Sequence, residues 1–503
     1  MGLLFHLYRL TNHLLTWDSV YNFYNSQNTI HLGRCFLTIS CGIGSYYDLQ
    51  WINGLLSLFY LSLTCVCLTE LFALRRRTSI FLVCGLTVSF PSVASTFAYM
   101  YTADGYFLAQ LCATLAVLVT LKYKKGFLPG LLLLAFSYGS YQAYVSFAVM
   151  LILTWTLLQL MQSERSVREL LPIWIRFLLM GGLGTLLYFL CNRLLTAVQG
   201  IAASDYNGIS AMSLPDGPGF VLAVKNCLID FAYFFFGPLG RVNFYKMLNG
   251  VLFLLLLFLI VRIVRKQTLY RKPASLLMIA LCFAAMPFVC SMIYFLSADV
   301  RYYMLMYAGF SLIYLLPVLL YDRFFPGEEA QDQRFDVHRQ STIAAAFQAP
   351  DFPGLVLAWG CVLITGLHIF SFALTDNISY LYLTTSNEKT FALVSRMTDR
   401  IEQLDDFPSA RKLCVIGHFD DYDTISLMLP PAMAGVRDSY LISEQAHFAA
   451  MMDTYFGLKL ENCTKEEQRR IRDSETFRNM DCWPAASGVT QIGDTVVIKI
   501  GES

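Results

Sequence analysis

Long apolar stretches, separated by short polar turns, follow one another through the first three quarters of the chain. Each stretch is long enough for a helix that crosses about 30 Å of hydrocarbon. The stretches are residues 52–74, 79–97, 104–122, 173–195, 247–264, 273–296, 303–321 and 353–374. This pattern predicts eight clear membrane-spanning helices.

Two further apolar segments are less regular. Residues 127–161 are too long for one ordinary span, and the polar "SYGSYQAY" at 137–144 favours a hairpin of two short helices. Residues 223–240, which end in "FFFGPLGR", favour an interfacial or re-entrant segment. The alternative is one long helix at 127–161 combined with a true span at 223–240. We therefore expect a polytopic α-helical membrane protein with about 10 to 11 membrane helices.

The composition agrees with this interpretation. Of the 503 residues, 56% are hydrophobic and 15% are charged, whereas about a quarter of the residues of a soluble domain are charged. The net charge is +1, and no basic run is long enough to follow a phosphate backbone. We expect membrane lipid, and no nucleic acid, among the partners.

The distribution of positive charge predicts the orientation. Lys and Arg gather at residues 75–77, at 122–125, at 262–272 and around Arg323. Because cytoplasmic loops carry the excess of Lys and Arg, these clusters are predicted to lie inside the cell. Residues 1–50 and everything after 375 then lie outside the cytoplasmic membrane of a bacterium. The first fifteen residues are too short to span the bilayer, so we expect either a stunted first helix or the loss of an upstream piece.

The tail after residue 375 has a different character. Here "KLCVIGHF" and "DTVVIKI" favour strands, while "NEKTFALVSRMTDRIEQL" and "TKEEQRRIRDSETFRNM" have helical spacing of apolar and charged positions. We predict two domains, a multi-pass membrane catalytic domain at 1–375 and a small extracytoplasmic α/β domain at 376–503.

Several ionisable residues share the outer end of the bundle on this topology. Such side chains are costly in lipid and usually face a polar cavity, so the set predicts a pocket that opens outward. Helix capping is the alternative, and Asp104 in "YTADGYFLAQL" suits an N-cap. The set comprises Asp18, Arg34, Asp48, Asp104, Asp299 and Arg301.

The substrate of such a pocket is expected to arrive in the membrane, since the chain has no GxxxxGK[ST] motif and no GxGxxG motif between a strand and a helix. A sugar carried on a lipid phosphate suits an Arg that binds the phosphate and a carboxylate that deprotonates the attacking hydroxyl. We expect no cofactor, although a weak divalent cation held by Asp18 and Asp104 stays open.

An ordered set of segments then carries a family resemblance. In chain order they are "TWDSVYN" with "HLGR", "YYDLQWINGLLSLFYLSL", "FAYMYTADGYFLAQLCATLAV", "SYGSYQAYVSFAVMLIL", "SADVRYYML" and "CWPAASGVTQIGDTVVIKI". The set resembles the bacterial membrane glucosyltransferases that modify O-antigen, which are polytopic enzymes of GT-C type. The resemblance covers most of the chain, and the last segment is similar to the closing Trp-Pro and Gly-Asp hairpin of that family.

The resemblance implies transfer of a hexose, typically glucose, from a polyprenyl-phosphate donor to a cell-surface glycan on the outer face of the membrane. It implies that Asp18, in the acidic first loop, is the general base. Asp104 matches the acid at the outer start of a later helix and is the second catalytic candidate. Because Asp18 stands alone in its loop, Asp104 or Asp48 are alternatives for the catalytic role.

The resemblance also implies substrate-binding residues. Arg34 matches the Arg of a Gly-Arg pair, Tyr141 and Gln142 match a Tyr-Gln-Ala element, and Arg301 resembles an Arg that meets the donor phosphate. The structural alternatives are an anchor at lipid headgroups for either Arg, hydrogen bonding between helices for Tyr141 and Gln142, and an interfacial boundary for Asp48.

Two other classes compete with the transferase. A transporter or flippase of lipid-linked sugars would concentrate charges near the membrane midplane and would have related halves, whereas the acids here gather at the outer ends and no repeat is visible. An inactive scaffold whose outer domain binds a cell-wall polymer is the second rival.

Overall fold

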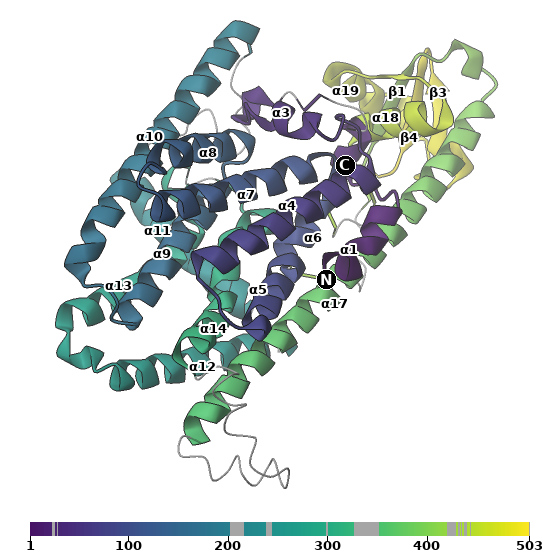
Figure 1. Cartoon of the computed structure of the whole chain (residues 1–503). Helices are drawn as coiled ribbons and strands as arrows, with labels where there is room; N and C mark the ends of the chain where they lie inside the picture. The colour runs from purple at the N-terminus through teal and green to yellow at the C-terminus, as the bar shows by residue number, and fades with distance from the viewer. Residues whose placement is uncertain are drawn as a thin grey trace.

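The computed structural model describes residues 1–22, 26–27, 29–201, 216–237, 244–297, 300–325, 352–419, 429–430, 433, 435–436, 440–442 and 444–501. The chain forms a bundle of helices with a smaller sheet-containing unit at one end (Figure 1). The helices of the bundle are α1 Gly2–Thr11, α2 Trp17–Tyr21, α3 Leu37–Gly42, α4 Gln50–Leu71, α5 Arg77–Ser89, α6 Pro91–Ala98, α7 Met100–Lys122, α8 Phe127–Ser140, α9 Tyr144–Met161, α10 Val167–Gln199, α11 Gly217–Phe236, α12 Phe244–Lys266, α13 Pro273–Cys290, α14 Ser311–Phe324 and α17 Phe352–Glu402.

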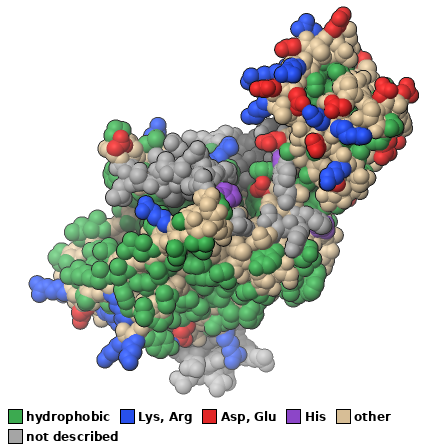
Figure 2. All heavy atoms as spheres, turned by 90° about the horizontal axis from the view of Figure 1, so that it is seen from above, with side chains coloured by type: hydrophobic (Ala, Val, Ile, Leu, Met, Phe, Trp, Pro, Cys, Tyr) green, Lys and Arg blue, Asp and Glu red, His purple; other side chains and the backbone are tan. Residues whose placement is uncertain are grey.

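Among the described residues, ten helices are long and apolar enough to cross a membrane when α5 is counted with α6 and α14 with the 3-10 helix η5, Met304–Phe310. Apolar side chains cover the flank of the bundle, whereas charged side chains crowd the C-terminal unit (Figure 2). The chain is therefore a polytopic helical membrane protein, as the hydropathy pattern predicts. Helix α1, at the start of the sequence, has ten residues.

Helix α7 lies in the middle of the bundle and packs against α4 and α8. Four small side chains along it, Ala103, Ala109, Ala113 and Ala116, are completely buried. Small residues let neighbouring backbones approach closely, which is the main source of helix association where both helices and lipid are apolar. The alanines of α7 therefore fix the position of everything that this helix carries at its two ends.

The predicted hairpin at 127–161 is confirmed. Helix α8 ends at Ser140, and Tyr141 has an extended backbone with φ −155° and ψ 108°. Helix α9 then begins at Tyr144. The break exposes backbone groups and places Tyr141 and Gln142 between two helices rather than inside one.

The two ends of the bundle differ. Helix α17 begins beside the end of α12 and runs for 51 residues into the C-terminal unit. We call the end where it meets that unit the domain end. The opposite end is the basic end, defined by residues 75–77, Lys122, Arg265, Lys266 and Arg323. The predicted boundary between residues 375 and 376 falls inside the continuous helix α17 and stays a prediction.

Helix α11 packs against α12 and α13. Near its start, Phe220 packs against Phe295 of η4, Met292–Phe295, just beyond the end of α13. Near its end, the Phe235 carbonyl accepts a hydrogen bond of 2.8 Å from Asn249 of α12. The Phe235 ring also lies 5.5 Å from the Tyr314 ring of α14 and 4.9 Å from the Phe253 ring of α12. Helix α11 is long and apolar enough to cross a membrane, and the interfacial interpretation of 223–240 stays a prediction.

The C-terminal unit contains a four-stranded sheet in the order β2-β1-β4-β3. Strand β1 is parallel to β2 and β4, whereas β3 and β4 form an antiparallel hairpin. The two strands predicted from the sequence are β1 and β4. The elements are β1 Lys412–Ile416, α18 Gln445–Phe456, β2 Glu461–Asn462, α19 Lys465–Asp473, α20 Glu475–Arg478, β3 Val489–Ile492 and β4 Thr495–Lys499.

One buried side chain fastens the start of the chain to α17. The Asn387 amide accepts a hydrogen bond from the Leu15 N–H at 2.9 Å and donates one to the Leu15 carbonyl, also at 2.9 Å. Asn387 is 5% exposed and Leu15 is 1% exposed. Since Leu15 is followed directly by α2, this pair of bonds fixes the entry into α2.

Replacing Asn387 by Ala would leave both backbone groups of Leu15 buried without these partners. We expect Asn387→Ala to lower the free energy of unfolding by about 1–3 kcal/mol, measured as a lower Tm of the purified protein. The matched control is Thr385→Ala on the same helix, because the exposed Thr385 hydroxyl bonds only to the Leu381 carbonyl one turn away. Equal Tm values for the two variants would contradict the role of Asn387.

Candidate active site

The backbone before Arg34 is held tightly at the domain end. The 3-10 helix η1, Ile30–Leu32, ends at Gly33, whose φ of +70° is a left-handed conformation that favours glycine. A Cβ atom at Gly33 would lie 2.6 Å from Gln142 Nε2 and 2.7 Å from the Tyr188 hydroxyl oxygen. These two groups bond to the same turn, since Gln142 donates to the Leu32 carbonyl at 3.1 Å and Tyr188 donates to the Gly33 carbonyl at 2.9 Å. The Gly of the Gly-Arg pair is therefore required by space and by conformation.

The Arg34 side chain lies against two aromatic rings. Its Nη1 donates to the Tyr106 hydroxyl at 2.8 Å. Its guanidinium carbon is 5.7 Å from the Tyr106 ring centroid and 5.5 Å from that of Tyr141. The two rings stack on each other with centroids 4.2 Å apart. Aromatic faces attract a cation, so α7 and the α8–α9 break together position one positive charge.

Asp18 lies within the electrostatic reach of Arg34. It occupies the first turn of α2, which begins with a capping box between Thr16 and Ser19. Burial raises the pKa of Asp18 to about 6, and the positive charge of Arg34 acts in the opposite direction. A carboxylate and a guanidinium thus lie within electrostatic reach of each other at the domain end.

The C-terminal unit supports α2 from the other side. The Trp17 and His447 rings meet edge to face with centroids 5.6 Å apart. His447 belongs to α18, and Val20 of α2 is part of the apolar core of the C-terminal unit. The short helix that carries Asp18 is therefore fixed between the bundle and the C-terminal unit.

Asp104 is completely buried near the start of α7. No described side chain hydrogen bonds to either of its carboxylate oxygens, and the Asn53 side-chain oxygen also has no partner among the described residues. A Cβ atom built on Gly44 would lie 2.7 Å from Asp104 Oδ2 and 3.4 Å from Asn53 Oδ1. A buried carboxylate without hydrogen bonds destabilises a fold. Asp104 therefore lowers the stability of the protein, and packing alone does not explain why an acid stands at this position.

Asp48 forms a separate centre with Arg9. Burial raises the pKa of Asp48 to about 6, and the positive charge of Arg9 opposes this shift. The Gln50 amide donates to Asp48 Oδ1 at 3.3 Å. Arg9 is completely buried and its Nε donates to the Phe97 carbonyl at 2.9 Å. Asp48 therefore lies with Arg9 of α1, whereas the Arg34 guanidinium lies on the tyrosine pair.

Arg301 is exposed and forms no hydrogen bond or ion pair with a described residue. Its neighbour Asp299 lies outside the described residues. The structure therefore brings together four of the predicted residues, Asp18, Arg34, Tyr141 and Gln142, with Asp104 on the helix that carries Tyr106. It does not bring Asp48 or Arg301 into this group. The roles assigned to all seven stay predictions.

No metal site marks this group in the described part of the chain. No cluster of three or more His, Cys, Asp or Glu side chains there could hold a metal ion. The prediction of no cofactor stays untested. The two clearest cavities lie at the basic end and contain none of the candidate residues.

Sequence reasoning missed several polar groups. Tyr106 and Tyr188 lie inside predicted spans, where nothing in a single sequence separates a hydroxyl that faces the site from one that faces a neighbouring helix. His447 is far away in the chain. Asp376 of α17 could have been found from the sequence. It is completely buried, and neither of its carboxylate oxygens is hydrogen-bonded to a described residue. An acid next to an apolar run marks a functional candidate by default.

Comparison with known proteins now gives the class and the family. The bundle and the match of a family model over residues 7–318, more than half of the chain, together define a polytopic membrane glycosyltransferase. The particular family is the one described as "Glucosyl transferase GtrII", and the chain belongs to it. No match was found among the curated proteins or among the solved structures.

The cost of burying Asp104 can be tested directly. We expect Asp104→Asn to raise the Tm, by the equivalent of about 1 kcal/mol, because an uncharged amide of the same shape can donate toward the Asn53 oxygen. The matched control is Asp322→Asn. Asp322 is also buried, but it accepts N–H bonds of 3.1 Å from Arg75 and Arg76, so its replacement should lower the Tm. A lower Tm for Asp104→Asn would assign Asp104 a structural role.

The conformation of the Gly33 turn gives a second test. Gly33→Ala would place a methyl group against Gln142 and Tyr188 in a backbone region that disfavours alanine, so it should displace Arg34. We expect glucosyl transfer to fall by at least about tenfold while the protein still inserts into membranes. The control is Gly182→Ala in α10, where a new Cβ meets nothing within 4 Å. Full activity of Gly33→Ala would contradict the placement of Arg34.

Proposed function

We propose that the protein transfers glucose from a polyprenyl-phosphate donor to a cell-surface glycan at the domain end of the bundle. The observation that carries the proposal is that Asp18 lies within the electrostatic reach of Arg34, whose guanidinium rests on two tyrosine rings. A glycosyl transfer needs one negative group to accept a proton and one positive group to bind a phosphate. The two groups come from segments that only the fold brings together.

The reaction proposed here is one displacement at the anomeric carbon. Asp18 takes the proton of the acceptor hydroxyl as its oxygen bonds to that carbon. The bond from the anomeric carbon to the phosphate oxygen breaks, and the polyprenyl phosphate leaves with its negative charge. Arg34 stabilises this charge, because a guanidinium matches two phosphate oxygens at once. Direct displacement inverts the anomeric configuration.

The orientation proposed for the chain follows from the charge of its two ends. Lys and Arg collect at the basic end, and cytoplasmic loops carry the excess of positive residues. The domain end, with Asp18, Arg34 and the C-terminal unit, then faces the outside of a bacterial cytoplasmic membrane. The donor lipid stays in the bilayer, and its sugar reaches the site at the surface where the glycan acceptor is found.

Replacing Asp18 by Asn removes the proposed base without changing the shape of the side chain. We expect transfer of radiolabelled glucose from the purified lipid donor to fall by about 10²- to 10⁴-fold, while the Tm and membrane insertion are unchanged. The control is Asp399→Asn, an exposed acid on α17 that bonds only to Gln403 of the same helix. Transfer that survives in Asp18→Asn would overturn the assignment, and Asp104 would be tested next.

The same base predicts a pH profile. Because the pKa of Asp18 is raised to about 6, kcat/KM should fall below pH 6, approaching tenfold for each further pH unit as the carboxylate becomes protonated. Above pH 6 the carboxylate is ionised, so the titration of Asp18 should no longer change kcat/KM. A profile with no acid limb near pH 6 would contradict a base in this environment. Retention of the donor's anomeric configuration would exclude the single displacement.

A further inference from the structure

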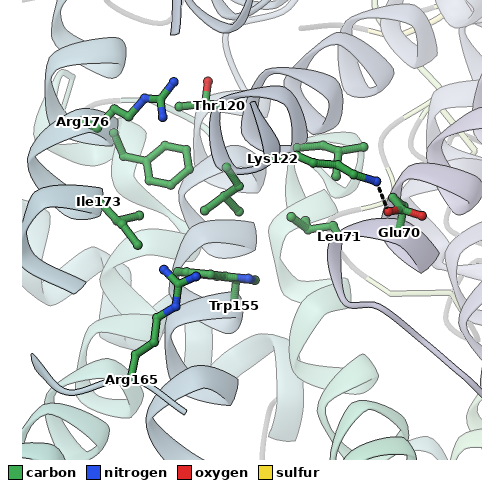
Figure 3. Close-up of a pocket in the computed structure, with 11 residues that line it drawn as sticks. Glu70, Leu71, Thr120, Lys122, Trp155, Arg165, Ile173 and Arg176 are labelled. Carbon is green, nitrogen blue, oxygen red and sulfur yellow. Dashed lines mark hydrogen bonds and ion pairs between the residues drawn. The ribbon is translucent and has the colours of Figure 1, made fainter. Parts of the chain in front are cut away.

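A cavity of about 260 Å³ opens at the basic end between α4, α7, α9 and α10 (Figure 3). It is far from Asp18 and Arg34, because it lies at the opposite end of α7. Its lining combines cations with apolar side chains. The lining residues are Glu70, Leu71, Leu118, Thr120, Leu121, Lys122, Trp155, Arg165, Ile173, Arg176 and Phe177.

The charge of this lining is positive. It contains three cations, Lys122, Arg165 and Arg176, and one acid, Glu70, which pairs with Lys122. An ion pair between exposed side chains is worth little, so it leaves Lys122 able to meet another anion. The net charge of the lining favours a negatively charged ligand.

The two arginines are held in place from opposite walls of the cavity. Arg176 Nη2 donates to the carbonyls of Tyr123 and Lys124, each at 2.9 Å, and so covers the negative end of α7. The Arg165 guanidinium carbon lies 5.5 Å from the Trp155 ring centroid. Arg165 is exposed and has no hydrogen bond or ion pair to a described residue. It therefore presents free donors at the mouth of the cavity.

The apolar part of the lining is suited to a chain and not to water. Ile173 and Phe177 of α10 form one wall, with Leu118 and Leu121 of α7 on the other. Leu178 of the same helix does not line the cavity and is 76% exposed on the outside of the bundle. Helix α10 therefore carries an apolar wall of the cavity and an apolar outer surface at neighbouring positions.

We propose that this cavity binds an anionic phospholipid, with the phosphate headgroup at Arg165 and Lys122 and an acyl chain along α10. A small soluble anion would use the cations and leave the apolar wall exposed. A neutral lipid would use the wall and leave the net positive charge without a partner. Only an anionic amphiphile matches both the cations and the apolar wall. Basic pockets between helices on the cytoplasmic side are known to bind such headgroups. This proposal rests on the membrane location and not on the chemistry proposed for Asp18.

The test is a lipid titration of the purified full-length protein followed by Tm and by native mass spectrometry. The probes are phosphatidylglycerol, phosphatidylcholine and inorganic phosphate. We expect phosphatidylglycerol to raise the Tm and to stay bound in the spectrometer, and the other two to have little effect. Equal protection by inorganic phosphate would overturn the lipid assignment in favour of a free anion, and equal protection by phosphatidylcholine would show that the charge is irrelevant.

Two variants should change the affinity in opposite directions. Arg165→Gln should weaken phosphatidylglycerol binding about fivefold, because one Arg near a surface contributes about 1 kcal/mol to anionic lipid binding. Glu70→Gln should strengthen it by a similar factor, since it removes the one opposing charge. Both side chains are exposed, so folding is not expected to suffer.

The matched control is Arg168→Gln, an exposed arginine three residues away that does not line the cavity. Its affinity for phosphatidylglycerol should equal that of the unaltered protein. If Arg168→Gln weakens binding as much as Arg165→Gln does, the lipid responds to the overall basic surface and the cavity site is refuted. Unchanged affinity in both Arg165→Gln and Glu70→Gln would refute it as well.

Discussion

The close packing of α7 in the middle of the bundle is the constraint on which both ends of the protein depend. Ala103, Ala109, Ala113 and Ala116 let the backbones of α4 and α8 approach. One end of α7 carries Asp104 and Tyr106, and the other end carries Lys122. Because lipid offers no hydrophobic drive for helices to associate, this steric fit fixes where those polar groups lie. A larger side chain in the middle of α7 would therefore disturb both ends together.

Polar groups in this bundle are held at the domain end by backbone fit and by aromatic contact. Gly33 allows a turn to pass between Gln142 and Tyr188, and the turn directs Arg34 onto the Tyr106 and Tyr141 rings. Asp104 lacks such partners. A fold optimised for stability alone would replace a buried carboxylate of this kind. Its presence beside Gly44 and Asn53 at the domain end suits a functional site, since departures from the most stable arrangement gather where function requires them.

Hydropathy predicted much of the fold, because a span needs only length and apolar composition. The spans, the break at 137–144 and the strands around Cys414 and Val497 all followed from local pattern. Depth in the membrane was also predictable, and this is why acids and arginines at one end were singled out together. Rotation about each helix axis was not, and it left Tyr188 and Tyr106 without a sequence signal. The path of the connecting segments was not predictable either, and it places Asp48 with Arg9 and Asp18 within reach of Arg34.

The family match covers residues 7–318, yet the site is shaped by residues beyond it. Asn387 of α17 bonds to both backbone groups of Leu15, and His447 of α18 packs against Trp17. These contacts enclose the short helix that carries Asp18. The catalytic carboxylate proposed here therefore owes its position to two parts of the chain, the bundle that supplies Arg34 and the C-terminal unit that holds α2. The C-terminal unit therefore contributes to the position of Asp18 through α2, while the bundle alone positions Arg34.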